Sequence, residues 1–244
     1  MRIGIGVTTY NRPKTLELWD SQINKFTPND GCEIHIADDS KERKGIAYRK
    51  NECLTALKDY DYVFLFDDDC LVLKEGWAEF FIEASKASGQ KHFCYLKETP
   101  TIKKIQSIEM VNQKGLLKHI AEIEQKEERA TINIFNNCAG AMMFLTKEVI
   151  EKVGAYNPKY GKYGFEHAGY SNRIHKSGLT PLGAYTCPEG AGEYIYSMDL
   201  DNHLPFNKDV NHKPSMANEI KNIPTYIALN KDIYLQDTEI YIPL

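Results

Sequence analysis

The chain has 244 residues, of which 42% are hydrophobic and 26% charged, as in ordinary water-soluble globular proteins. Its formal net charge of -4 makes nucleic acid a less favoured partner, because nucleic-acid-binding domains usually carry a surplus of Lys and Arg. No stretch approaches the ~20 consecutive apolar residues of a transmembrane helix. The six scattered cysteines lack the paired spacing of a zinc site. We therefore expect a soluble, reduced, cytoplasmic protein without a transmembrane segment.

The beginning of the chain alternates between strand-like and helix-like patterns. Strands are expected at Ile3–Val7, Cys32–Ala37 and Tyr62–Phe66. Helices are expected from Pro13 onward, where proline suits the first helical position, and over Ile46–Leu57, where apolar residues recur at helical spacing. This β-α-β-α-β order is typical of a parallel sheet with right-handed crossovers.

The remaining elements follow a less regular pattern. Residues 101–130 are rich in Lys, Glu and Gln and are interpreted as a helical insert. Helices are also expected at Ala78–Ala87, Lys147–Val153 and Phe165–Ser177, and strands at His92–Leu96, Ile132–Phe135, Ala139–Leu145, Thr225–Leu229 and Glu239–Ile242.

Three consecutive carboxylates, Asp67, Asp68 and Asp69, follow the buried strand Tyr62–Phe66. Because like charges repel, such a cluster is costly unless a cation or solvent stabilises it. Mg²⁺ or Mn²⁺ would suit it, since both ions take oxygen ligands and are often shared between one or two carboxylates and substrate phosphates. The alternative is a solvated acidic turn.

Further polar groups follow the first two strands. Thr8, Tyr10 and Arg12 suit a nucleotide base and its phosphates, although a polar loop that caps the next helix explains them as well. Asp39 could accept a hydrogen bond from a base or a ribose, or simply cap a helix. Arg49, with Lys50 beside it, could neutralise a diphosphate, and the alternative is a solvated basic helix face.

A Glu-His pair, Glu166 and His167, opens the helix expected at Phe165–Ser177. A carboxylate there complements the helix dipole, and beside a histidine it could also take a proton from an acceptor hydroxyl. Upstream, Gly140 lies in a run of small residues, which would let a ligand approach the backbone or would serve packing alone.

Taken in order, these motifs resemble the family-2 glycosyltransferases with the GT-A fold. The resemblance covers residues 3–178 and consists of V-T-T-Y-N-R-P, A-D-D-S, G-I-A-Y-R-K-N, F-D-D-D-C, C-A-G-A-M-M-F, V-G-A-Y and G-F-E-H. It implies an α/β fold with a Rossmann-like, mostly parallel central sheet flanked by helices. It also implies a metal-dependent, inverting hexosyltransferase that moves a sugar from a nucleotide-diphosphate sugar, first of all a UDP-sugar, to an acceptor hydroxyl with Mn²⁺ or Mg²⁺.

The resemblance also suggests a domain organisation. Residues 1–190 would form the catalytic domain that binds the nucleotide sugar, with 101–130 as its insert. Residues 191–244 would form a C-terminal extension on the acceptor side, packed on the same domain.

Residue roles follow from the same resemblance. Asp69 would be the direct metal ligand, with Asp67 and Asp68 beside the ribose and donor sugar and Asp67 also near the metal. Substrate-binding positions would be Thr8, Tyr10, Arg12, Asp39, Arg49 and Gly140. The family usually has Glu-Asp where this chain has Glu166-His167, so either residue could be the general base, and Glu166 is favoured. His212 is favoured over His203 as a third metal ligand, on a loop that could close over the diphosphate.

Two other functions agree with parts of the pattern. A nucleotidyltransferase would also place carboxylates and a metal on an α/β sheet, but it needs a glycine-rich phosphate loop where this chain has Tyr10-Asn11-Arg12-Pro13. A non-catalytic module that binds sugar nucleotides would be consistent with the altered Glu-His pair. The acceptor stays open among glycans, lipid-linked saccharides, proteins and modified nucleobases.

Overall fold

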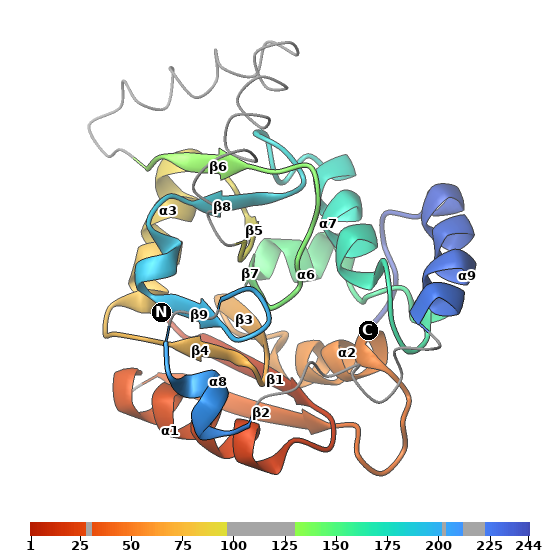
Figure 1. Ribbon diagram of the computed structural model, residues 1–244. Coiled ribbons are helices and arrows are strands. Elements are labelled where there is room, and N and C mark those ends of the chain that lie inside the picture. Colours follow the sequence, from red (N-terminus) through yellow and green to blue (C-terminus); the bar gives the residue numbers. More distant parts are fainter. Residues whose placement is uncertain (28–30, 97–129, 202–203, 212–222) are drawn as a thin grey trace.

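The computed structural model describes residues 1–27, 31–96, 130–201, 204–211 and 223–244. In these ranges a central five-stranded sheet has the order β2-β1-β3-β7-β5 (Figure 1). β1 pairs in parallel with β2 and β3, whereas β7 runs antiparallel to both β3 and β5. The strands are β1 (Ile3–Thr9), β2 (Cys32–Asp38), β3 (Tyr62–Asp67), β5 (His92–Cys94) and β7 (Met142–Thr146). This arrangement confirms the predicted α/β class with a mostly parallel sheet.

Helices cover both faces of the central sheet (Figure 1). Because successive residues of a strand point to opposite faces, Phe64 and Phe66 pack into one core and Val63 and Leu65 into the other. The first core includes side chains of α1 (Pro13–Phe26) and α3 (Trp77–Ser88). The second includes side chains of α2 (Ile46–Leu57), α6 (Lys147–Val153) and α7 (Glu166–Lys176). A strand buried on both faces explains the uninterrupted apolar run of β3.

Two glycines of β1 bring α2 close to the sheet. A Cβ atom on Gly6 would lie 2.7 Å from the Cβ of Cys53, and one on Gly4 would lie 3.0 Å from the Cβ of Leu57. Only glycine fits these positions without moving the helix. The close approach places the first turns of α2, which carry Arg49, beside the ends of β1 and β3.

Smaller elements surround the carboxyl end of the sheet. β4 (Cys70–Val72) pairs with β9 (Ile195–Ser197), and β6 (Ile132–Ile134) pairs with β8 (Thr186–Pro188), in both cases antiparallel. The described part also contains α8 (Phe206–Asp209), α9 (Ile223–Gln236) and the short 3₁₀ helices η1 (Pro158–Tyr160) and η2 (Ala191–Glu193).

α9 lies beside the segment that leads into α7 (Figure 1). The side-chain amide of Asn230 donates to the carbonyls of Tyr160, Tyr163 and Gly164 at 2.7, 2.7 and 2.9 Å. These hydrogen bonds fix α9 against the loop that precedes α7. The C-terminal part of the chain therefore takes part in shaping the surroundings of Glu166.

Most predicted elements agree with the structure, and the helices Ile46–Leu57 and Lys147–Val153 have the predicted bounds. The strand predicted at Thr225–Leu229 is wrong, because these residues lie within α9. Glu239–Ile242 forms no strand, and Ile242 makes only an isolated bridge to Gly154. The insert predicted at 101–130 lies outside the described residues except for its last position. Within the described ranges, no helix combines the length and the apolar character needed to cross a bilayer.

Candidate active site

The hydroxyl groups at the end of β1 orient the carboxylates at the end of β3. Thr8 Oγ1 donates to Asp67 Oδ1 at 3.0 Å, and Thr9 Oγ1 donates to Asp68 Oδ2 at 2.6 Å. The parallel register of the two strands, which pairs Thr8 with Asp67, makes this contact possible. Thr8 was predicted to lie near the nucleotide base, and in the structure its hydroxyl donates a hydrogen bond to the Asp67 carboxylate.

Two cations of the chain neutralise part of the Asp67–Asp69 cluster. The guanidinium of Arg12 contacts Asp68, and its Nη1 lies 2.6 Å from Asp69 Oδ2. Lys50 Nζ lies 2.8 Å from Asp67 Oδ1, and the Lys50 side chain is fully buried. Three carboxylates therefore share two cations, and the cluster would gain from another positive charge.

The pKa values of the cluster reflect burial and these cations. Burial raises the pKa of Asp68 to about 7, against the lowering effect of Arg12 and with a further rise from Asp69. Burial likewise raises the pKa of Asp69, although Arg12 opposes it. Burial acts in the same direction on Asp67, but the charges of Lys50 and His167 outweigh it and lower the pKa of that carboxyl.

Asp39 and Arg49 anchor the start of α2. Asp39 accepts hydrogen bonds from the backbone N–H groups of Lys44 and Gly45 at 2.7 and 2.9 Å, and from Arg49 Nε at 3.0 Å. The remaining guanidinium nitrogens of Arg49 donate to Glu42 and Glu52 at 2.9 and 2.7 Å. Both residues border a cavity at this edge of the sheet, but in this structure their charged groups bind one another and the start of α2.

Tyr10 lies at the same edge of the sheet. The guanidinium carbon of Arg43 is 3.7 Å from the centroid of its ring, a cation–π contact. Tyr10 is half-buried, so its side chain forms part of the site's wall without being enclosed.

Glu166 and His167 form a buried hydrogen-bonded pair at the start of α7. Glu166 is 3% exposed, and its Oε1 lies 3.0 Å from His167 Nδ1. The other oxygen, Oε2, and His167 Nε2 have no hydrogen-bond partner among the described residues. Burial lowers the pKa of His167, but the hydrogen bond and charge of Glu166, together with Asp67, outweigh it and raise that pKa.

Gly140 makes room for this pair. A Cβ atom at Gly140 would lie 2.1 Å from His167 Nδ1. The small residue is thus required by the packing of the imidazole, which is the simpler of the two explanations that the sequence left open.

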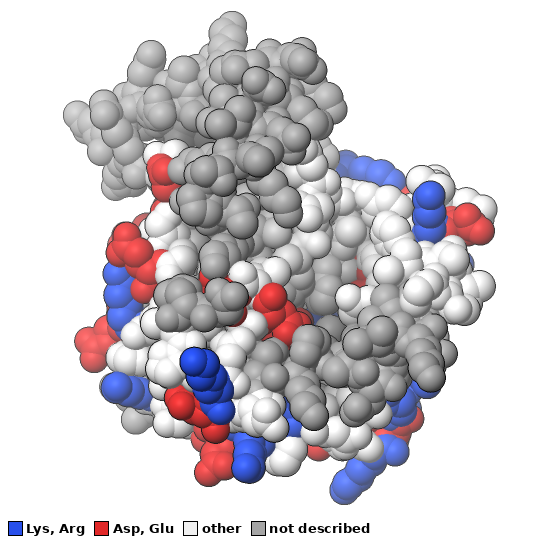
Figure 2. Space-filling view, in the orientation of Figure 1, with Lys and Arg blue, Asp and Glu red and all other residues white. Residues whose placement is uncertain are grey.

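Most of these groups border a single cavity of about 710 Å³, whereas Lys50 and Asp68 do not line it. Asp68 lies behind the cavity wall and is fully buried. In Figure 2 the face is hollowed near its centre, where acidic atoms reach the rim, while most visible Lys and Arg atoms lie at the periphery. The predicted residues that line the cavity are Thr8, Tyr10, Arg12, Asp39, Arg49, Asp67, Asp69, Gly140, Glu166 and His167. His212, the predicted third metal ligand, lies outside the described residues.

The sequence did not identify every group at this site. It named Lys50 only as a possible diphosphate partner, whereas the structure pairs it with Asp67. Thr9 and Asp199 were also missed. Thr9 donates a hydrogen bond to Asp68, and Asp199 lines the cavity. Thr9 could have been found because it ends a strand beside the acidic cluster, and Asp199 because it stands with Asp201 in the acidic stretch D-L-D-N-H.

The carboxylates fit a divalent metal that shares its ligands with a substrate. Across the ranges that the structure describes, no group of three or more His, Cys, Asp or Glu side chains is arranged to hold a metal by itself. Asp67 and Asp69 nevertheless line one cavity together. Mg²⁺ and Mn²⁺ sites built from one or two carboxylates and substrate phosphates need no more than this from the protein.

Solved structures of GT-A glycosyltransferases have the same fold as this chain. A mannosyltransferase from Pyrobaculum calidifontis, solved with GDP-Man and Mn²⁺, has a TM-score of 0.51 at 14% identity, over 98% of this chain and 76% of its own. Residues 1–349 of S. aureus TarS give a TM-score of 0.50 at 11% identity, over 81% of this chain and 60% of that one. These likenesses show the fold.

The sequence itself has a curated relative of the same class. An uncharacterized glycosyltransferase of Acanthamoeba polyphaga mimivirus is 25% identical over 210 residues, which is 74% of this chain and 76% of the relative. No protein-family model matches the sequence. The fold and this relative confirm the resemblance to family-2-like glycosyltransferases and the predicted enzyme class.

Proposed function

We propose that this protein transfers a sugar from a nucleotide-diphosphate sugar to an acceptor hydroxyl and inverts the anomeric centre. The observation that carries the proposal is the single cavity in which Asp67 and Asp69 face the same space as the buried Glu166. The glycosyltransferase relative and the GT-A fold support it. The similar fold solved with GDP-Man and Mn²⁺ supports a nucleotide-sugar donor and a divalent metal.

Asp69 and Asp67 would hold Mn²⁺ or Mg²⁺ together with the donor phosphates. When bound, the metal supplies positive charge that stabilises the departing diphosphate. The nucleoside would lie toward Tyr10 and Asp39, at the end of the cavity formed by β1, β2 and the start of α2. Arg49 would contribute by holding Asp39 in place through its hydrogen bond. A UDP-sugar stays our first choice of donor.

Glu166 would act as the general base. Its Oε2 is buried and has no hydrogen-bond partner among the described residues, so it can accept the proton of an incoming hydroxyl. The acceptor oxygen then bonds to the anomeric carbon while the bond from that carbon to the phosphate oxygen breaks. The proton moves to Glu166, and His167, bound to Oε1, stabilises the orientation of the carboxylate.

The first experiment is a donor panel. UDP-, GDP- and TDP-sugars are incubated with the protein and Mn²⁺ or Mg²⁺, with and without acceptors, and the release of nucleoside diphosphate is measured. We expect turnover with the sugar nucleotides of one nucleobase and loss of turnover in EDTA. NMR of the product should show an inverted anomeric configuration. Binding without turnover, or release of pyrophosphate from a nucleoside triphosphate, would contradict the proposal.

Two isosteric variants then separate the candidate bases. Because general-base catalysis contributes about 10²–10⁴-fold, Glu166→Gln should lower kcat by that factor. His167→Asn should lower it less, since the base itself remains. If His167→Asn loses more turnover than Glu166→Gln, histidine is the base. A retained anomeric configuration would refute the inverting mechanism.

A further inference from the structure

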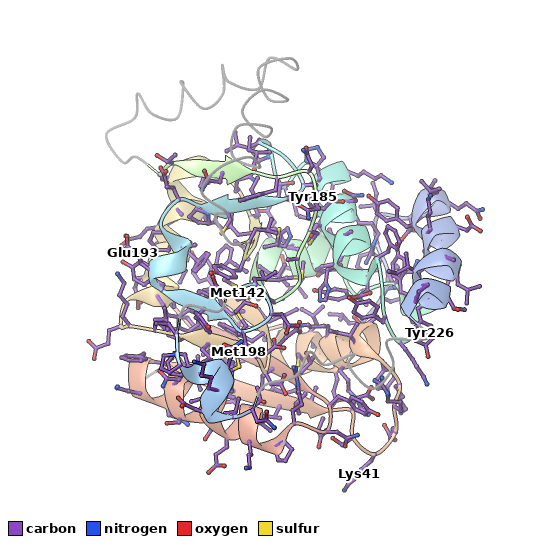
Figure 3. All side chains as sticks on the ribbon, in the orientation of Figure 1. Lys41, Met142, Tyr185, Glu193, Met198 and Tyr226 are labelled. Carbon is purple, nitrogen blue, oxygen red and sulfur yellow. The ribbon has the colours of Figure 1, made fainter. Side chains whose placement is uncertain are left out.

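An aromatic wall, made of Tyr163, Phe165, Tyr185 and Tyr234, lines the cavity next to Glu166. The four side chains are half-buried, so part of each ring remains accessible from the cavity. They come from three separate parts of the chain: the loop before α7, the connection from α7 to β8, where Figure 3 shows Tyr185, and α9. Three segments therefore converge to place aromatic surface beside the proposed base.

The aromatic wall is held rigidly by its own contacts. The Tyr234 hydroxyl accepts a hydrogen bond from Asn172 Nδ2 at 2.6 Å and lies 3.1 Å from the Tyr185 hydroxyl. The rings of Phe165 and Tyr234 are tilted by 34°, with centroids 4.9 Å apart. Little side-chain freedom is left to lose when a ligand binds there, which favours affinity.

Phe165 also has an unusual backbone conformation. Its φ is 66°, in the left-handed region that residues other than glycine rarely occupy. Such a conformation is strained, and strained backbone is concentrated at functional sites. Here it directs the chain into α7 so that an aromatic ring and the Glu166 carboxylate border the same cavity.

The chemistry of the aromatic wall suits a carbohydrate. A pyranose ring presents an apolar face of C–H groups, which packs on the electron-rich face of an aromatic ring, while its hydroxyl groups form hydrogen bonds at the edge. The hydroxyls of Tyr185 and Tyr234, 3.1 Å apart, are polar groups of this wall.

We propose that the acceptor is a saccharide, with its ring packed on the aromatic wall and its reacting hydroxyl at Glu166 Oε2. This inference rests on the proposed transferase function and adds the chemical class of the acceptor. It assigns Tyr185 and Tyr234 as acceptor-binding residues.

The test uses methyl glycosides of common hexoses and pentoses as acceptors. For each protein, the ratio of sugar transfer to donor hydrolysis is measured at a fixed acceptor concentration. We expect this ratio to fall at least tenfold in Tyr185→Ala and in Tyr234→Ala. Tyr241→Ala is the matched control, because Tyr241 is 55% exposed and does not line the cavity, and it should keep the ratio of the unchanged protein.

Phenylalanine variants separate the ring from the hydroxyl. Tyr185→Phe and Tyr234→Phe keep the stacking surface, so their transfer ratios should stay above those of the alanine variants. An unchanged ratio in both alanine variants overturns the proposal. A serine peptide, or DNA with hydroxymethylated bases, that accepts sugar better than every methyl glycoside also overturns it.

Saturation-transfer NMR with the methyl glycosides, without donor, distinguishes this inference from the proposed function. Signals that are present with the unchanged protein and lost in both alanine variants support a saccharide site even if no sugar nucleotide is turned over. In that case only the transferase function fails. The absence of signals from every glycoside in the panel, while donor hydrolysis proceeds, refutes the saccharide acceptor and leaves the transferase function standing.

Discussion

Replacement of Arg12 by methionine tests how the acidic cluster is stabilised. Arg12 contacts Asp68 and Asp69, whose side chains are 0% and 5% exposed. Methionine keeps an apolar stem but removes the positive charge. Removing one partner of a buried ion pair costs about 3–5 kcal/mol, because the other charge remains buried and uncompensated. We expect Arg12→Met to lower the free energy of unfolding by about this amount in the absence of metal.

A divalent cation should recover much of this loss. In the unchanged protein an added cation must compete with Arg12 for Asp69, whereas in Arg12→Met the carboxylate is available. A ligand at 100 times its Kd adds about 2.7 kcal/mol to stability. Mn²⁺ should therefore stabilise Arg12→Met more strongly than the unchanged protein, and at lower concentration.

The assay is urea unfolding in EDTA and in a series of Mn²⁺ concentrations. Arg43→Met is the control, because Arg43 stacks on Tyr10 and approaches Asp39 instead of the cluster. Its response to Mn²⁺ should match that of the unchanged protein. A loss below about 1 kcal/mol in Arg12→Met, within the range of exposed ion pairs, or an equal effect of Mn²⁺ on both proteins, would refute the reasoning.

Three other substitutions test separate features of the site and core. Gly140→Ala would place its Cβ 2.1 Å from His167 Nδ1, so we expect about 1–3 kcal/mol of destabilisation in urea and reduced turnover. His92 is buried with its pKa lowered to about 4. Its stabilising contribution is thus present above its unfolded pKa of about 6.5 and lost as the pH falls toward 4. Between pH 7 and 4.5 the unchanged protein should lose about 2 kcal/mol more than His92→Asn. Lys50→Met leaves the Asp67 carboxylate without its cation and should cost about 3–5 kcal/mol in urea unfolding at neutral pH.

Each of these has a matched control. Gly192→Ala should be tolerated, because the nearest atom to its Cβ, the hydroxyl oxygen of Tyr95, would be 3.8 Å away. His35→Asn changes a partly exposed histidine and should not alter the acid sensitivity. Lys86→Met removes an exposed lysine of α3 and should stay within about 0.5 kcal/mol of the unchanged protein. Equal effects of a substitution and its control would contradict the corresponding prediction.

Local sequence patterns were sufficient to predict the helices that pack one apolar face against the central sheet. Ile46–Leu57 agrees with α2 because its apolar residues recur at helical spacing, pack with β3 in one core and approach the glycines of β1 closely. Thr225–Leu229 failed because a short apolar run with β-branched residues is consistent with either strand or helix. What fixes α9 is contact with a distant loop: Asn230, which follows this run, binds carbonyls more than sixty residues away.

The position of the site could be predicted, but its internal pairing could not. The polar groups predicted after the first strand and after Phe66 lie at one edge because parallel strands end there, and Thr8 forms a hydrogen bond with Asp67. Which cation neutralises which carboxylate depends on how α2 packs on the sheet and on the turn after β1. Neither can be derived from residue spacing, so Lys50 could not be assigned to Asp67, nor Arg12 to Asp69.

These pairings bear on how donor and metal would bind. Asp69 is bound to Arg12, and the part of the chain that the structure describes contains no complete set of metal ligands from the protein alone. A metal that brings donor phosphates gains the missing oxygen ligands, and those phosphates offer Arg12 a new anionic partner near Asp69. Each ligand thus lowers the cost of binding the other, and by linkage the effect is the same in both directions. Mn²⁺ should tighten donor binding by the same factor as the donor tightens Mn²⁺ binding, and calorimetric titrations that show independent binding would contradict this coupling.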